Sequence, residues 1–329
     1  MQKIIPLFQK LEIAPPFFHI HGGLTMPKLM LLADSEKYLR NNCYQHQLLE
    51  HLEANFEVTI VSQRRIRYFP LLSPERFDFI LSVMRQRTLF SLCEKLSQVV
   101  GDAPLHIYDQ DPWENFLDNS SSRGTYEKVL ELMNIRGILT TSNWWAKFAK
   151  NQGMPAKFVR MGVLRRYCVV GPKWMERKIT LGFQGTIHDH RHRFFNELNS
   201  MGIGITILPS SSHQCYLSNL HDIRIYIHSE KTDWKINGES YQANSLWIKD
   251  VEVAARGCFA IRNSDEDEEA YDIKGIPSIF TFNHIKEIPD IINSIESLTH
   301  ASKREMVNAS VNTIRERNDW QTIADALLC

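Results

Sequence analysis

Short apolar runs alternate with longer amphipathic stretches from residue 27 onward. "PKLMLLAD" (27–34) is almost continuously apolar, which is typical of a strand buried on both faces of a sheet. Amphipathic segments of helical length follow such runs, and this alternation predicts βαβ units with a parallel sheet. In the first half of the chain the pattern predicts strands at 27–34, 56–62, 76–84, 104–112, 135–142 and 156–163.

A stretch without a clear period interrupts the alternation. "LRRYCVVGPKWMERK" (164–178) contains a Gly-Pro pair and indicates a linker. The alternation then resumes, with strands expected at 179–185, 202–209, 223–229, 258–263 and 276–282. We therefore predict an α/β fold with two doubly wound Rossmann-like domains that face each other across a cleft, where ligands bind at the carboxyl ends of the strands. The predicted parts are an N-terminal arm (1–26), a first domain (27–163), the linker (164–178), a second domain (179–310) and a last helix (311–329).

Composition narrows the functional classes. The 38 Lys and Arg residues balance the 38 Asp and Glu residues, so no broad positive field is expected to hold nucleic acid or an anionic membrane. The longest apolar runs are strand-sized, which predicts no transmembrane segment. The first residues lack the apolar core of a signal peptide, and the six cysteines form no Cys-x-x-Cys pair, so free thiols and a cytoplasmic location are expected. The acidic run "SDEDEEAYD" (264–272) reads as a solvated loop.

The segment around residue 250 suggests an anion site. If a helix begins near Asn244 and Ser245, these residues are natural N-caps, and the first turn offers free N–H groups that bind phosphate. Lys249 then lies about one turn into the helix, within reach of a second phosphate. Glu252 shares its face and can accept two hydrogen bonds from a ribose diol. An ordinary ion pair between Lys249 and Glu252 on a solvated face is the alternative, and spacing alone favours it.

With its flanks, this segment resembles the donor-binding helix of GT-B glycosyltransferases, including the spore-maturation-type branch. The resembling residues are "NSLWIKDVEVAARGCFAI" (244–261). Glu252 matches the family's second glutamate, which the resemblance implies holds the nucleotide ribose. Asn244 stands where the first glutamate would be, so this chain departs from the pattern there. Lys249 falls where branch members often have a basic residue that faces the diphosphate.

Other segments extend the resemblance over nearly the whole chain from residue 27. "ITLGFQGTIHDHRHRFFNEL" (179–198) is similar to the first strand and loop of the family's C-terminal domain. The resemblance implies that Gly185, with Thr186 beside it, lets backbone approach the donor phosphates, and that Arg191 or Arg193 is the basic residue of that loop. The end of the chain resembles the family's terminal helices, the last of which crosses back to the first domain.

Candidate residues for the acceptor side come from the first half. Asp109 and Asp111 follow a predicted strand, and a carboxylate there can take the proton from an acceptor hydroxyl. Alternatively, Asp111 fixes a turn before Pro112. "HIHGG" (19–23) contributes His19 or His21 as a second candidate base, and its His-x-His pattern also suggests a metal hydrolase.

The sequence thus favours a GT-B glycosyltransferase that moves a sugar from a nucleoside-diphosphate donor, built on UDP or GDP, to an acceptor hydroxyl. The acceptor would be a glycan, a lipid-linked molecule or a small molecule, and an oligomer is compatible with the pattern. No cofactor and no metal are expected, because the helix start and basic side chains would meet the leaving-group charge. Two alternatives stay open: a nucleotide-sugar epimerase on the same fold, and a non-catalytic subunit that binds a nucleotide or a partner.

Overall fold

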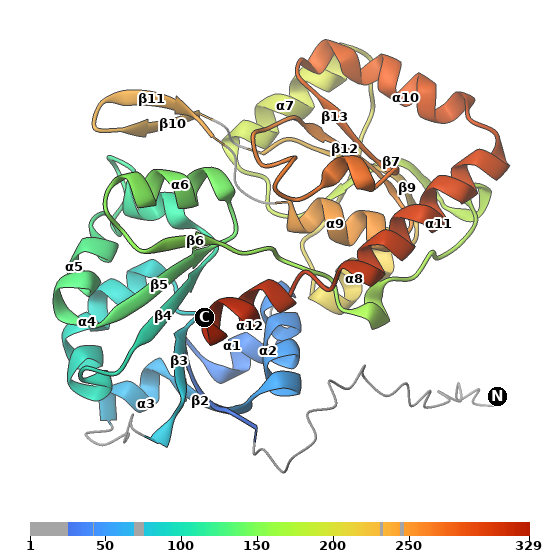
Figure 1. Cartoon of the computed structure of the whole chain (residues 1–329). Helices are drawn as coiled ribbons and strands as arrows, with labels where there is room; N and C mark the ends of the chain where they lie inside the picture. Colours follow the sequence, from blue (N-terminus) through green and yellow to red (C-terminus); the bar gives the residue numbers. More distant parts are fainter. Residues whose placement is uncertain (1–25, 42, 69–75, 231–232, 244–246) are drawn as a thin grey trace, which may run out of the picture.

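The computed structural model describes residues 26–41, 43–68, 76–230, 233–243 and 247–329. Each half of the chain forms a lobe around its own parallel sheet, and the two lobes lie side by side (Figure 1). The first lobe contains a six-stranded sheet in the order β2-β1-β3-β4-β5-β6, and the second a five-stranded sheet in the order β13-β12-β9-β7-β8. The predicted fold class, with two doubly wound α/β lobes, is therefore confirmed.

The first sheet is covered by helices on both faces. Its register pairs Leu31 with Ile60 on one neighbouring strand and with Leu81 on the other. Successive residues of β1 serve opposite faces: Leu29 and Leu31 belong to one buried cluster, whereas Met30 and Leu32 belong to another. The strands are β1 (Lys28–Ala33), β2 (Glu57–Ser62), β3 (Phe79–Ser82), β4 (Leu105–Asp109), β5 (Ile135–Thr140) and β6 (Ala156–Phe158); the helices are α1 (Glu36–Asn41), α2 (Cys43–Asn55), α3 (Gln63–Tyr68), α4 (Gln86–Val100), α5 (Thr125–Leu132) and α6 (Asn143–Asn151).

The second lobe repeats this plan with shorter strands. The turns after β7, β8 and β9 lie at the carboxyl edge of the sheet, where ligands bind in folds of this kind. Its strands are β7 (Ile179–Gln184), β8 (Thr206–Leu208), β9 (Ile223–His228), β12 (Phe259–Asn263) and β13 (Ile279–Phe282); its helices are α7 (Asp189–Ser200), α8 (His213–Leu220), α9 (Ile248–Ala255), α10 (Ile288–Ser297) and α11 (His300–Arg317).

An antiparallel hairpin leaves the second lobe and packs on the first, above α6 in Figure 1. Its strands are β10 (Asp233–Ile236) and β11 (Glu239–Gln242). Asn237 and Gly238 form the two-residue turn with φ values of 54° and 80°, as a type I′ turn requires. Trp234 lies in the core cluster of the first lobe, and the Asp118 carboxylate of that lobe accepts the two turn N–H groups at 2.8 and 3.0 Å. The hairpin therefore fastens the two lobes together.

The acidic run 264–272 is an inter-lobe contact, so the expectation of a solvated loop was wrong. Asp267 is 1% exposed, and its carboxylate accepts the N–H groups of Asn143 and Trp144 at 3.2 and 3.0 Å. These groups open α6, so a carboxylate of the second lobe caps a helix of the first. Tyr271 is fully buried, and its hydroxyl donates to the Thr141 carbonyl at 2.7 Å. Charge composition alone did not reveal this packing.

The chain ends on the first lobe. Asn318 adopts a left-handed conformation and separates α11 from α12 (Gln321–Leu328), within the stretch predicted as one last helix. Figure 1 shows α12 beside α2 of the first lobe. Thr322 Oγ1 accepts the Arg160 N–H at 2.9 Å, which ties α12 to the residues just after β6. No helix in the described ranges is long and apolar enough to cross a membrane.

The segment predicted as a linker, 164–178, is held against the second lobe. Arg177 is 2% exposed and donates to five main-chain carbonyls, among them that of Val170 at 2.9 Å. The Val169 N–H donates to the Ala255 carbonyl at 2.9 Å. Gly257 adopts a φ of +74° directly beneath this segment, and a Cβ added there would lie 2.0 Å from the Val170 carbonyl oxygen.

We predict that Gly257→Ala destabilises the protein more than Gly202→Ala. Both glycines adopt nearly the same φ, +74° and +80°, but a Cβ at Gly202 would meet nothing within 4 Å. Both variants should lose about 1 kcal/mol through the left-handed backbone, and Gly257→Ala about 1–3 kcal/mol more through the clash. Urea unfolding measures the two free energies. Equal losses of unfolding free energy in the two variants would show that the Val170 carbonyl does not restrict residue 257.

Candidate functional site

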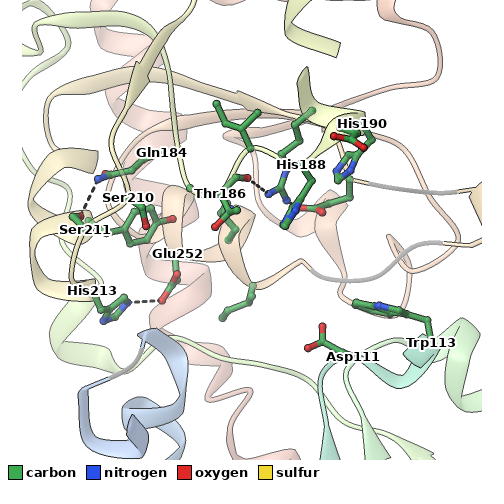
Figure 2. Close-up of a pocket in the computed structure, with 18 of the residues that line it drawn as sticks. Asp111, Trp113, Gln184, Thr186, His188, His190, Ser210, Ser211, His213 and Glu252 are labelled. Carbon is green, nitrogen blue, oxygen red and sulfur yellow. Dashed lines mark hydrogen bonds and ion pairs between the residues drawn. The ribbon is translucent and has the colours of Figure 1, made fainter. Parts of the chain in front are cut away.

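A large cavity lies where the carboxyl edges of the two sheets face each other. Its volume is about 1120 Å³. Loops after β4, β7, β8 and β9 line it together with the first residues of α9, and Figure 2 shows side chains that line it. The lining residues are Asp111, Trp113, Glu114, Leu117, Gln184, Gly185, Thr186, Ile187, His188, Asp189, His190, Arg191, Arg193, Ser210, Ser211, Ser212, His213, Tyr216, Glu230, Trp234, Ile248, Lys249 and Glu252.

Gly185 and Lys249 approach each other closely at the floor of this cavity. Gly185 follows β7 with a φ of +150°, and a Cβ at this position would lie 2.9 Å from Lys249 Nζ. The ammonium also lies 5.2 Å from the centre of the Phe183 ring, a cation–π contact. A side chain at residue 185 would therefore displace the lysine, and glycine leaves bare backbone beside a cation.

Burial and the charges around Lys249 lower its pKa, and a bound anion would oppose this shift. Burial lowers the pKa of Lys249, and the charge of Arg191 lowers it further, while Glu230, Asp250 and Glu252 act in the opposite direction. An anion beside Nζ would favour the charged ammonium and oppose this downward shift. The site therefore gains more from a bound anion than an exposed lysine would.

The two arginines of the loop after β7 have different roles. Arg191 is 7% exposed; it donates to the Thr186 carbonyl at 2.8 Å and pairs with Glu230 at 2.5 Å. Burial would raise the pKa of Glu230, but hydrogen bonding from His228 and the charge of Arg191 hold it well below its usual value. Arg191 thus fixes the shape of the loop. Arg193 is exposed and lines the cavity, so it is the arginine that can reach a ligand.

Helix α9 begins later in the sequence than predicted. Its first residue is Ile248, and Trp247 occupies the N-cap position. Asn244 and Ser245, the predicted caps, lie outside the described residues. Lys249 is consequently in the first turn of the helix. The N–H groups of that turn have no acceptor within the helix, so they can bind an anion beside the Lys249 ammonium.

Buried charges anchor α9 against the sheet. Asp250, one residue after Lys249, is fully buried and accepts hydrogen bonds from His228 at 2.6 Å and from Arg262 at 2.9 Å. Burial would raise the pKa of Asp250, but the charges of these two partners hold it below its usual value. Arg262 also stacks on Trp247 with 3.8 Å between the guanidinium carbon and the ring centre. These contacts fix the rotation of the helix, and hence which side chains face the cavity.

Glu252 lines the same cavity, three residues beyond Lys249. It is 4% exposed, and its Oε1 accepts hydrogen bonds from Gln47 Nε2 at 2.8 Å and from His213 Nε2 at 2.9 Å (Figure 2). Gln47 lies on α2 of the first lobe, so both lobes hold this carboxylate. Both hydrogen bonds end on Oε1, and the side chain stays at the cavity wall. The alternative of a solvated surface ion pair with Lys249 is excluded by this burial.

The first lobe contributes a different wall. Asp111 lines the cavity and lies across it from Glu252 in Figure 2, but Asp109 does not line it. The Asp109 carboxylate points into the lobe, where it accepts hydrogen bonds from Gln86 at 2.6 Å, Tyr126 at 2.6 Å and the Asp111 N–H at 2.9 Å. The prediction that Asp109 is catalytic is therefore wrong, because its oxygens are buried and occupied.

Asp111 has a raised pKa. Burial, followed by the negative charges of Asp109 and Glu114, raises the pKa of Asp111 to about 7, and Arg85 acts against them. The Asp111 side chain is also exposed to the cavity, where water screens part of its interaction with these charges. A carboxyl group that is deprotonated near neutral pH and faces a cavity has the properties of a general base.

Sequence reasoning missed several residues of this site. Gln47 and His213 hold Glu252, and Trp113 and Trp234 form an aromatic wall. Ser212 caps α8 through a hydrogen bond from the Cys215 N–H, and a serine before a helical stretch was the available signal for His213. Gln47 lies far away in sequence, and no local pattern indicates it.

The histidine patterns do not gather into a metal site in the described residues. His19 and His21 lie outside those residues, so the role predicted for His21 stays a prediction. His188 occupies the N-cap position of α7 without a capping hydrogen bond from its side chain, and it lines the cavity. Within the described part of the chain, no three His, Cys, Asp or Glu side chains lie together as a candidate metal site.

Several solved structures share the two-lobed architecture of this chain. Neither a protein-family model nor a curated protein sequence matches the chain. HepE of Anabaena, solved with UDP and glucose, is 12% identical with a TM-score of 0.64, covering 92% of this chain and 99% of its own. An α-glucosyltransferase, solved with UDP-glucose and DNA, is 11% identical with the same TM-score and the same coverage. The β-glucosyltransferase of phage T4 is 11% identical with a TM-score of 0.58, covering 91% of this chain and 99% of its own.

These likenesses extend over nearly the whole chain. At identities of 12% and 11% they establish the fold alone. The spore-maturation-type branch stays a prediction. The chain has the GT-B fold.

Proposed function

We propose that this protein is a metal-independent glycosyltransferase that moves a sugar from a nucleoside-diphosphate donor to an acceptor hydroxyl. The observation that carries the proposal is the placement of Lys249 and Glu252 on one helix, both facing a cavity between the carboxyl edges of two parallel sheets. A cation at the start of the helix and a carboxylate one turn later match a diphosphate followed by a ribose. The solved neighbours with this fold bind UDP or UDP-glucose, which supports a donor of that class.

The second lobe would hold the donor. The diphosphate would lie over Gly185, between Lys249 Nζ and the first N–H groups of α9, with Arg193 at the rim. The ribose hydroxyls would donate to Glu252, whose orientation is set by Gln47 and His213. In this arrangement the negative charge that develops on the leaving diphosphate meets fixed positive groups.

The first lobe would supply the base. In the transfer step the acceptor oxygen forms a bond to the anomeric carbon, and the bond from that carbon to the diphosphate oxygen breaks with its electron pair. The acceptor hydroxyl proton passes to the Asp111 carboxylate. Asp111 faces the donor-binding wall from the opposite lobe, which is where a base must be to act on an incoming acceptor.

We expect Glu252→Ala to weaken UDP binding at least tenfold in isothermal titration. Loss of hydrogen bonds to a charged group is worth about 1.5–3 kcal/mol, and 1.4 kcal/mol corresponds to a factor of ten. Asp222→Ala is the matched control, because Asp222 is a carboxylate of the same lobe in a surface pair with Lys178. Circular dichroism confirms that both variants are folded. Affinity for UDP and GDP that equals the wild type in Glu252→Ala would refute the donor assignment.

We expect transfer from UDP-glucose to rise with pH and to level off above a pKa near 7. Asp111 acts as a base only when ionised, and the environment of its carboxyl group raises this pKa, with Glu230 adding to the effect of the nearer carboxylates. Asp111→Asn should lower the rate about 10²–10⁴-fold and remove this dependence. Glu114→Gln should shift the rise to lower pH, since it removes a negative charge. An unchanged pH profile in Asp111→Asn would contradict the assignment of Asp111 as the base.

Transfer should persist in excess EDTA, because the proposed mechanism uses no metal ion. Loss of activity in EDTA would contradict the proposed independence from metals.

A further inference from the structure

The wall of the cavity formed by the first lobe has a distinct chemistry. The described residues that this lobe contributes are Asp111, Trp113, Glu114 and Leu117, that is, two carboxylic acids, an indole and an aliphatic side chain. Among the described lining residues, Arg191, Arg193 and Lys249 all come from the second lobe. The second lobe also contributes Asp189, Glu230 and Glu252, so its wall carries both signs of charge, whereas the wall of the first lobe is acidic and aromatic.

The aromatic part of this wall is held rigidly. Trp113 is partly exposed on a short 3₁₀ turn, Pro112–Asn115, and its ring stacks on Trp234 of the hairpin with 5.2 Å between centroids and 30° between planes. Trp234 is itself fixed, because its Nε1 donates to the Ala243 carbonyl at 2.7 Å and its ring packs edge-on against Trp145 at 5.7 Å. An indole that is already ordered loses little entropy when a flat ligand packs on it.

The polar groups beside the indole are hydrogen-bond acceptors. Glu114 accepts from Ser120 Oγ through Oε2 at 2.8 Å, which orients the carboxylate. Asp111 lies next to Trp113 in Figure 2 and is close enough to Glu114 for the charge of Glu114 to raise its pKa. Ionised carboxylates accept hydrogen bonds from hydroxyl groups. A flat apolar surface bordered by such acceptors fits a sugar ring, whose C–H face is apolar and whose rim carries hydroxyls.

The same charges disfavour an anionic acceptor. A phosphate or carboxylate on this wall would face Asp111 and Glu114, with the buried Asp109 behind them. Arg85 is the cation that acts on Asp111, but it lies outside the lining and pairs with Asp34 at 3.7 Å. Like charges brought together in a partly desolvated site repel each other strongly.

We propose that this wall is the acceptor subsite and that it takes a neutral carbohydrate, whose ring stacks on Trp113 and whose hydroxyls bind Glu114 and Asp111. The inference rests on the proposed glycosyl transfer and specifies its acceptor. The attacking group is then a sugar hydroxyl next to Asp111, which receives its proton. Trp113 and Glu114 become determinants of acceptor specificity. The α-glucosyltransferase neighbour was solved with DNA, and on this account the present chain differs from it in the acceptor that it takes.

The experiment measures binding of maltose, cellobiose and lactose to the protein saturated with UDP, by ligand-observed NMR at up to about 10 mM sugar, a range that detects millimolar dissociation constants. At least one sugar is expected to bind. Trp113→Ala should weaken that binding about tenfold, whereas Trp113→Phe, which keeps an aromatic face, should weaken it less. The affinity for UDP should stay within about twofold in both variants, because Trp113 faces the acceptor, and this readout also shows that the cavity is folded.

Three results would overturn the inference. They are the absence of binding by all three sugars, unchanged sugar affinity in Trp113→Ala, and glucosylation of a DNA oligonucleotide in preference to the sugars. Failure of the wild-type protein to bind UDP or GDP would instead refute the proposed function itself. The two claims can therefore fail separately.

Discussion

One buried carboxylate, Glu252, contacts both lobes and lines the cavity between them. Its Oε1 accepts hydrogen bonds from Gln47 of the first lobe and from His213 of the second. The Gln47 carbonyl oxygen in turn accepts the N–H of Leu164 at 2.9 Å, at the start of the linker. A single amide thus fixes α2, the linker and α9 relative to one another. A buried carboxylate is costly unless it is hydrogen-bonded, so the orientation of Glu252 depends on the lobes being in contact.

Segments from both lobes maintain this contact. The hairpin places Trp234 in the first lobe, Asp267 caps α6, and α12 lies beside α2. These contacts hold the two lobes together, and of their residues Trp234 also lines the cavity. Such a frame keeps the wall that carries Lys249 and the acidic wall of the first lobe facing each other, and a donor and an acceptor bound to the two walls would meet between them. Reacting groups held in this way avoid much of the entropy loss of a bimolecular step.

Much of the fold follows from hydrophobic periodicity, because buried parallel strands are nearly continuous apolar runs, and every strand of the two parallel sheets was predicted. The hairpin was missed, although Asn237-Gly238 between alternating residues is a strong local signal for one. The site was harder to predict. The spacing of Lys249 and Glu252 correctly predicted that both lie on one face of the helix. Asp109 and Asp111 look alike in sequence, and only the path of the chain after β4 decides which of them faces the cavity. Partners such as Gln47 and Asp267 depend on contacts between distant segments, which a single sequence does not encode locally.

The most direct test of the account is a crystal structure of the protein with bound UDP. The account predicts the diphosphate over Gly185, with an oxygen within about 3.2 Å of Lys249 Nζ, and the ribose hydroxyls on Glu252. UDP bound outside the cavity, or inside it with the ribose away from Glu252, would contradict the central claim. That claim is that the start of α9 with Lys249 binds the diphosphate and that Glu252, one turn later, binds the ribose.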